Sequence, residues 1–431
     1  MKILKGSFVI LILCMLSLPL FQKELSLVNE KRLNGFFRLQ SEPELEFLTW
    51  DRWFSSEFQE TISNQVEDHI GLRNTFFRIH NEYDYRLFGV THAKGFIRGE
   101  EGYLFEEDYI REYTGEFFIG KETIDYKLKK LKDVQQQFQK EGIGFLLVFE
   151  PGKASFHPEY IPEIYHPEKR SISNYDYITK RSKELDIPMM NLNEYFLLMK
   201  DTSRFPLFPK YGMHWSIYGA TLVLDTLKQH IEKVCQTPLP EIRIPEIRVS
   251  DSLIWTDKDI GDMLNLIFPL PEVTMAYPKI EFDTTNFTRN LSVLVVADSY
   301  YINLINDYTG NLFEDEEYWY YNSKLYPDII DDQEPVYVDK NNLKEKFREF
   351  DIILLMVSEI NLHCGFWNFP DEAYQAYFPE HSDPIWYPFE NRIRNEPEWF
   401  RFMVKKAKEN HTTLENIIRK DAKYLYKTEN R

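Results

Sequence analysis

The sequence predicts an α/β fold in which a parallel sheet is flanked by helices. Short, almost wholly apolar runs of strand length alternate with longer stretches whose apolar residues recur at helical spacing. Strands that are apolar at every position are typical of a parallel sheet covered on both faces, because neither face meets water. The 431-residue chain is 43% hydrophobic and 16% aromatic, which lets it bury enough surface to exclude a disordered protein.

The N-terminus has two lysines and then an uncharged apolar run at residues 6–21 (GSFVILILCMLSLPLF). This is the pattern of an export signal, so we expect residues 1–22 to be a signal peptide or an uncleaved signal anchor. The run is at the lower edge of the ~17–25 residues that span a bilayer, and no small-residue cleavage site follows it. The expected location is periplasmic or otherwise extracytoplasmic, with residues 6–21 anchoring the chain to the inner membrane.

Residues 23–90 are expected to form a helical segment before the main domain. Within 42–90 the apolar residues recur at mostly helical spacing, as shown by Phe54, Phe58, Ile62, Val66 and Ile70. The stretch 94–105 (KGFIRGEEGYLF) then places three glycines between apolar residues. That composition predicts short strands and turns at the opening of a new domain, which we place at residues 91–394.

The main domain alternates expected helices and strands in order. An apolar helical stripe over 124–138 ends at Gly142, and further helices are expected at 174–185 and 217–234. The expected strands are 143–149 (IGFLLVF), 187–191, 291–297 (LSVLVVA), 318–321 and 352–357 (IILLMV).

Two regions depart from this alternation. Residues 235–290 are rich in Pro, Ile and acidic groups, and we expect them to be an insertion before the strand at 291–297. Residues 395–431 are expected to be helices that close the fold and carry no chemistry.

The composition also limits the partners and cofactors. Lys and Arg number 51 against 69 Asp and Glu, a net charge of −18, which argues against nucleic acid because phosphate binding needs a basic surface. Three cysteines cannot form a disulfide framework or a four-ligand zinc site, and only Cys235 and Cys364 are left as a possible pair. We expect no metal and no cofactor.

Two segments carry candidate chemistry. Ser299 follows the buried strand 291–297, where active groups of open parallel sheets lie and where free N–H groups at a helix start can stabilise an oxyanion. Alone, Asp298-Ser299 is more often a helix cap. His214 lies in the loop 209–220 (PKYGMHWSIYGA), between aromatics and glycines, and is the best-placed base for a serine nucleophile. The other nine histidines carry no comparable signal.

Other side chains near the expected strand ends have weaker signals. Lys153 could reach an anionic donor or a sugar, although a lysine in such a loop more often only solvates it. Three tryptophans could stack on a sugar ring: Trp215, Trp319 and Trp367. Packing in the core is the more common role for each of them.

The segment GMHWSIYGA at 212–220 resembles the D/G-x-HW-(S/N)-x-x-G segment of the AlgJ/AlgX-type alginate O-acetyltransferase family, whose members are SGNH-hydrolase-like. Further segments follow in the family's order over roughly residues 60–370. They are YRLFG at 85–89, GEEGYLF at 99–105, FEPGKASFHPEYIP at 149–162, DIGDML at 259–264, ADSY at 297–300 and SEINL at 358–362.

The resemblance implies an SGNH-hydrolase-like fold and acetyl transfer to an exopolysaccharide or cell-surface glycan. Ser299 would be the nucleophile and His214 the base, and the possible supporting residues are Asp298, Gly212, Tyr300 and Lys153. The implied partners are a polysaccharide acceptor, a membrane-bound O-acyltransferase that delivers the acetyl group, and the membrane itself through the N-terminal segment. The charge of −18 favours a neutral or weakly charged acceptor over an anionic one.

One position departs from the family pattern. The triad acid often comes from D-x-H, and here that position is Gly212. We favour a Ser–His pair aided by a backbone carbonyl, and a remote carboxylate stays open: Asp201, Asp259 or Glu359. The alternatives are a carbohydrate acetylesterase and a non-catalytic binding or scaffold protein of an export complex. A separation of Ser299 and His214 well beyond hydrogen-bond reach would favour the scaffold.

Overall fold

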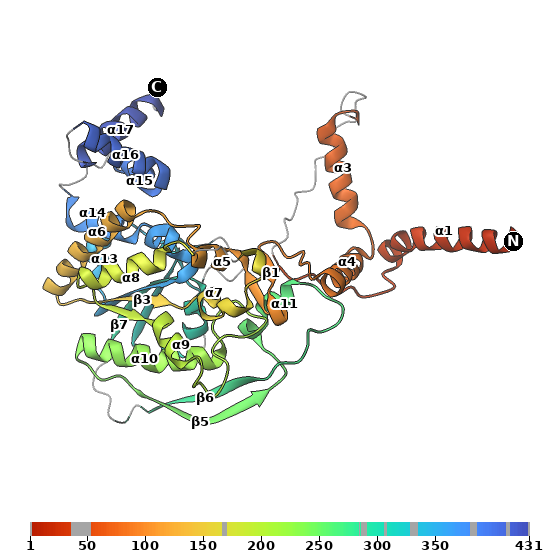
Figure 1. Ribbon diagram of the computed structural model, residues 1–431, viewed down its shortest axis with the longest axis horizontal. Coiled ribbons are helices and arrows are strands. Elements are labelled where there is room, and N and C mark those ends of the chain that lie inside the picture. Colours follow the sequence, from red (N-terminus) through yellow and green to blue (C-terminus); the bar gives the residue numbers. More distant parts are fainter. Residues whose placement is uncertain are drawn as a thin grey trace. The chain divides into compact units, whose positions relative to one another are not determined.

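The computed structural model falls into two compact units (Figure 1). One unit contains Met1–Arg98 and Asp259–Pro271, and the other contains Gly99–Lys258 and Glu272–Arg431. The structure describes residues 2–35, 53–165, 170–283, 285, 291–305, 308–327, 335–379, 386–410 and 414–429. Residues 36–52 of the helical segment expected at 23–90 lie outside the described residues.

The first unit is mainly helical. The side chain of Ser55 accepts a hydrogen bond from the Phe58 N–H and so caps the start of one helix, and Gly89 ends another in the left-handed conformation, with φ of 70°. The helices and the strand of this unit are α1 (Lys2–Leu25), α3 (Ser56–His69), α4 (Arg73–Phe88), β1 (Phe96–Arg98) and α11 (Asp259–Met263).

Side chains of α4 bind the distant segment 264–268. Arg78 donates to the Leu266 carbonyl at 3.1 Å, and Asn81 donates to the Leu264 carbonyl at 2.9 Å. The Glu82 carboxylate accepts the Ile267 N–H at 2.9 Å and the Phe268 N–H at 3.2 Å. These bonds explain why residues so far apart in the sequence belong to one unit.

Helix α1 contains the apolar run 6–21, with Pro19 inside it. Among the described residues, no helix is both long enough and apolar enough to cross a membrane. The signal peptide or signal anchor expected at residues 1–22 stays a prediction.

A six-stranded sheet forms the centre of the second unit, and all five strands predicted from the sequence are confirmed in it. They are β3 (Gly144–Glu150), β4 (Met189–Asn191), β7 (Ser292–Ala297), β8 (Asp315–Tyr320) and β10 (Ile352–Ser358). With β9 (Lys324–Leu325), the order is β4-β3-β10-β7-β8-β9. Strand β10 lies between β3 and β7 and is parallel to both, with Ser358 opposite Glu150.

The prediction of a wholly parallel sheet is wrong at one edge. Strand β9 pairs with β8 in the antiparallel direction, so the sheet is mixed. Tyr321 and Asn322 follow β8 with φ of 51° and 54°, and this left-handed turn sends the chain straight back along its own strand. A direct hairpin needs no crossover helix, so the alternating pattern of the other strands does not continue here.

Helices cover both faces of the sheet (Figure 1). Every second residue of the central strands joins one apolar core with α6 (Lys121–Lys140), α8 (Asn174–Glu184), α13 (Leu343–Phe347) and α14 (Phe369–Tyr377). The opposite face is covered by α9 (Leu192–Met199) and α10 (Ile217–Cys235), and α12 (Ile302–Ile305) packs against α10. Fully apolar strands are thus buried on both sides, as their composition predicted.

The remaining elements lie outside the sheet. Two long strands in the segment predicted to be an insertion form an antiparallel ribbon, and the C-terminal helices pack around a small core of their own. Within the described part of the chain, no disulfide joins Cys235 to Cys364. The elements outside the sheet are β2 (Leu104–Glu106), α5 (Glu107–Thr114), α7 (Lys153–Phe156), β5 (Glu241–Ser250), β6 (Met275–Asp283), α15 (Tyr387–Asn395), α16 (Pro397–Glu409) and α17 (Leu414–Glu429).

Candidate active site

The carboxyl ends of three neighbouring strands bring polar side chains together. Glu150 ends β3, Ser358 ends β10, and Asp298 follows β7 directly. All three are fully buried. Parallel strands end at the same edge of a sheet, which is where open α/β sheets hold their active groups.

Ser299 and His214 meet at this edge. The His214 Nε2 atom lies 2.9 Å from the Ser299 Oγ atom, although the two residues are 85 positions apart. Ser299 begins the 3₁₀ turn Ser299–Tyr301 that leads into α12. His214 lies just before α10, whose N-cap Ser216 accepts the Gly219 N–H at 2.9 Å. The separation is the one required of a serine nucleophile and its base.

Tyr300 supports the histidine from the serine side. Its hydroxyl donates to the Met213 carbonyl at 3.2 Å and accepts the Tyr109 hydroxyl at 3.1 Å. Its ring meets the rings of His214 and Trp215 edge-on, each with a centroid distance of 4.9 Å. Tyr300 therefore joins the loop of His214 to the turn that contains the serine.

Asp298 ties the strand ends together. One carboxylate oxygen accepts the Tyr300 N–H at 3.1 Å. The other accepts the Ser358 N–H at 3.0 Å, the Ser358 hydroxyl at 2.6 Å and the Asn361 amide at 2.8 Å. Ser358 and Asn361 were not singled out from the sequence, although both belong to the SEINL segment that resembles the family. Asp298 thus holds the serine turn against β10.

Glu150 is a second buried carboxyl group that the sequence did not point to. Burial, and then the negative charge of the nearby Asp298, raise its pKa well above the ordinary value. The raised pKa favours the protonated form of Glu150, which lessens the negative charge beside Asp298.

Gly212 cannot be replaced by the aspartate of the family pattern. A Cβ atom at this position would lie 1.9 Å from the Thr256 carbonyl oxygen and 2.7 Å from the Pro209 Cγ atom. The neighbouring Asp257 is fully buried and accepts the Ile217 N–H at 3.4 Å, at the start of α10. Residues 256–257 therefore shape the histidine loop, which is a role that no local sequence signal indicates.

The remote carboxylates have different surroundings. Glu359 is buried and accepts hydrogen bonds from the Ser155 hydroxyl and, at 3.2 Å, from the Asn193 amide. Asp201 is exposed after α9, and Asp259 belongs to the other unit. The Oε2 atom of Glu359 is thus bonded to Ser155 and Asn193.

Lys153 is buried, so its interpretation as a solvated loop residue is wrong. Only 1% of it is exposed. Its ammonium group donates to three backbone carbonyls: Leu104 at 2.7 Å, Lys210 at 3.1 Å and Gly212 at 2.7 Å. These bonds tie the histidine loop to the end of β3 and to β2. Lys153 is buried because its ammonium group binds the backbone of the histidine loop.

Two of the three candidate tryptophans lie in the interior. Trp215 and Trp319 are fully buried, which confirms core packing for both and excludes stacking on a sugar at the surface. Trp367 is partly exposed and packs edge-on against Tyr321 with a centroid distance of 5.3 Å.

The pH dependence of stability is expected to report on Glu359. Burial raises its pKa to about 7 from an ordinary 4.5, so between these values the folded protein holds a proton that the unfolded chain has lost. The free energy of unfolding should therefore fall as pH rises through this window, by up to about 3 kcal/mol. Urea unfolding at several pH values should show a shallower fall in Glu359→Gln than in the wild type.

The matched control for this series is Glu163→Gln, because Glu163 is exposed. Its profile should coincide with that of the wild type. If the free energy of unfolding of Glu359→Gln fell with pH as steeply as that of the wild type, the raised pKa of Glu359 would be contradicted.

Part of the chain also matches a known family by sequence. Residues 96–289 match the family model described as "SGNH hydrolase-like domain, acetyltransferase AlgX". The chain is thus similar to that family over this segment, as the motifs predicted. The match contains the His214 loop and ends before Ser299.

Three solved structures are similar to the chain at low identity. The O-acetyltransferase domain of Pseudomonas putida AlgJ is 14% identical with a TM-score of 0.42, covering 62% of this chain and 92% of that one. Bacillus cereus PatB1 is 12% identical with a TM-score of 0.40, covering 64% and 99%. Pseudomonas aeruginosa AlgX is 11% identical with a TM-score of 0.42, covering 68% and 71%. No curated protein matches the chain at a significant level.

Proposed function

We propose that this protein is an extracytoplasmic O-acetyltransferase that acetylates a glycan through an acyl-enzyme on Ser299. The observation that carries the proposal is the 2.9 Å contact between the His214 Nε2 and Ser299 Oγ atoms. This contact is the geometry of an activated nucleophile, and it argues against a scaffold in which the two residues would lie apart. The match to an acetyltransferase family model supports acetyl as the transferred group.

The first half of the reaction would load the enzyme. His214 takes the proton of the Ser299 hydroxyl while Oγ attacks the acetyl carbonyl of the donor. The tetrahedral intermediate collapses, its bond to the donor oxygen breaks, and His214 returns the proton to that leaving oxygen. The Ser299 N–H, at the start of a 3₁₀ turn, is the candidate donor to the oxyanion.

The second half would transfer the group. A glycan hydroxyl gives its proton to His214 and attacks the acetyl carbonyl, after which the ester bond to Ser299 breaks and the serine recovers a proton from His214. Water in place of the glycan would make the same site an esterase.

The histidine would be oriented without an acid at position 212. Tyr300 packs edge-on against the His214 ring and bonds the Met213 carbonyl, and Lys153 holds the Gly212 carbonyl. These contacts support a Ser–His pair whose base is held through its backbone and its ring face.

The proposed partners follow from the same function. A membrane-bound O-acyltransferase would deliver the acetyl group outside the cytoplasm. The net charge of −18 favours a neutral or weakly charged glycan as acceptor, because an anionic chain would be repelled outside any locally basic cleft.

A serine-directed fluorophosphonate is expected to label the purified chain at Ser299, because only a serine with an adjacent base reacts readily with it. Peptide mass spectrometry locates the label, and both Ser299→Ala and His214→Ala should abolish it.

The matched control is His230→Ala, since His230 lies on α10 and bonds the Thr226 carbonyl at 2.9 Å, outside the site. That variant should be labelled like the wild type. Labelling that persists in folded His214→Ala, or a folded wild type that is never labelled, would refute the proposal.

A further inference from the structure

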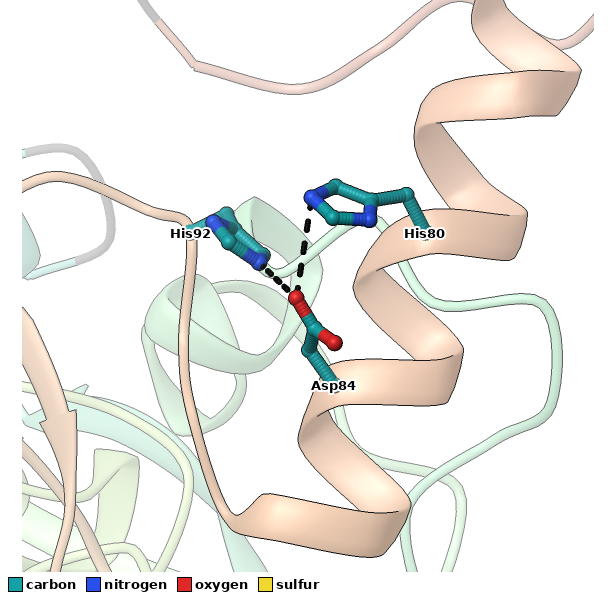
Figure 2. A group of neighbouring side chains, drawn as sticks. All are labelled: His80, Asp84 and His92. Atoms are coloured by element: carbon teal, nitrogen blue, oxygen red, sulfur yellow. Dashed lines mark hydrogen bonds and ion pairs between the residues drawn. The ribbon is translucent and has the colours of Figure 1, made fainter.

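Three side chains that can ligate metal lie together in the first unit, at the end of α4. His80 and Asp84 are four residues apart on the helix and therefore share one face. The helix ends at Gly89, whose φ of 70° turns the chain back, and His92 then lies beside the same face. Figure 2 shows the three side chains pointing toward one another.

The two histidines approach a single carboxylate oxygen. The His92 Nε2 atom lies 2.6 Å from Asp84 Oδ2, and the His80 Nε2 atom lies 3.6 Å from the same oxygen (Figure 2). The imidazole rings stack at a centroid distance of 4.5 Å with an interplanar angle of 28°. One ligand atom from each residue lies within 4.8 Å of the others, so small side-chain rotations suffice to place all three around one ion.

We propose that His80, Asp84 and His92 bind a zinc ion. Two imidazole nitrogens and one carboxylate oxygen are a donor set that zinc accepts, whereas calcium and magnesium prefer oxygen ligands alone. Three protein ligands leave the fourth tetrahedral position to water, which the exposure of the two histidine side chains, 60% and 37%, allows. The sequence expectation of no metal weighed only cysteines, and this site uses none.

An ion pair between Asp84 and a protonated histidine would need only one imidazole. The second imidazole is directed at the same oxygen and stacked on the first, which is an arrangement that an ion shared by all three explains. Without metal, each Nε2 can donate an N–H to the carboxylate. Zinc would instead take the lone pair of each Nε2 atom, and each neutral ring would then keep its single proton on Nδ1.

The helix that presents the ligands is held in place by neighbouring positions. Arg78, Asn81 and Glu82 bind the segment 264–268 through its backbone. His80 and Asp84 are therefore presented by a supported helix and need no refolding to bind. The ion would join the end of α4 to the segment that follows Gly89, and so fix this reversal of the chain.

Titration of the tag-free, chelator-treated full chain with Zn²⁺ alone tests the proposal. We expect one equivalent to bind, and His80→Ala, His92→Ala and Asp84→Asn each to weaken binding by at least about 100-fold, more than the loss of an outer-shell contact causes. Co²⁺ in place of Zn²⁺ should give the strong visible absorption of a four-coordinate ion in the wild type and not in these three variants.

The role in fixing the chain reversal has its own readout. Zn²⁺ should slow proteolysis within residues 89–95 in the wild type and leave the rate unchanged in His92→Ala. His230→Ala is the matched control and should bind zinc like the wild type, and circular dichroism checks that each variant is folded. No bound zinc in the wild type, or wild-type zinc affinity in the folded His80→Ala and His92→Ala variants, would overturn the proposal.

Discussion

Alanine at position 212 is expected to slow the labelling of Ser299 by at least about 100-fold, the effect of a displacement near 1 Å in a catalytic group. The φ angle of Gly212 lies outside the left-handed region, so the glycine is required by space and not by its backbone conformation. The added Cβ would overlap the Thr256 carbonyl oxygen, 1.9 Å away, and only a shift of the histidine loop relieves this. Overpacking of this kind should also cost about 3 kcal/mol of stability.

Gly212→Asp sharpens this test, because it restores the acid of the family pattern. If the only defect were a missing carboxylate, the aspartate would speed labelling. We expect it to be as damaging as alanine. The matched control is Gly310→Ala, since a Cβ atom at Gly310 meets no atom within 4 Å. Faster labelling in Gly212→Asp would show that the loop can move away from Thr256 at little cost.

Replacing Lys153 by methionine is expected to be the second most damaging change. Methionine fills a similar volume but leaves the carbonyls of Leu104, Lys210 and Gly212 without the ammonium group that binds them. The Lys210 carbonyl would keep the Leu104 N–H at 3.0 Å, but the buried ammonium bonds of all three carbonyls would be lost. The free energy of unfolding should therefore fall by about 3 kcal/mol or more. The Gly212 carbonyl is two residues from His214, so labelling of Ser299 should also slow by about 10-fold or more at temperatures where the variant is folded.

Lys127→Met separates this positioning role from a general loss of stability. Lys127 is also a buried lysine, and it binds Asp371 and Asn395 at 3.0 Å each, away from the histidine loop. Its loss should destabilise the fold while the folded fraction is labelled at the wild-type rate. Equal labelling in both lysine variants would mean that Lys153 only stabilises the fold.

Much of the second unit was predictable because its signals are local. Five apolar runs predicted five strands, since a strand buried on both faces must be apolar along its whole length. Alternating helices and strands predict parallel pairing, but the left-handed turn at Tyr321 and Asn322 leads to an antiparallel strand. No local feature of the sequence indicated this turn.

The site was predictable only in part. Ser299 after a buried strand and His214 in a shaped loop were visible in the sequence, while Glu150, Ser358 and the backbone of Thr256 were not. The last three act through contacts with residues far away along the chain. The same holds for the zinc site, where His80 and Asp84 are near in sequence but His92 joins them only because Gly89 reverses the chain.

The sequence by itself determined the class of fold, the candidate nucleophile and the candidate base, because hydrophobic periodicity and loop composition are properties of short segments. Only the tertiary structure decided that Ser299 and His214 lie 2.9 Å apart and that Lys153 is buried and binds three backbone carbonyls. It also decided why position 212 is glycine: the Thr256 carbonyl, 44 residues later in the chain, occupies the space of a side chain. Close packing is set by which segments meet, and that is not encoded in any one of them.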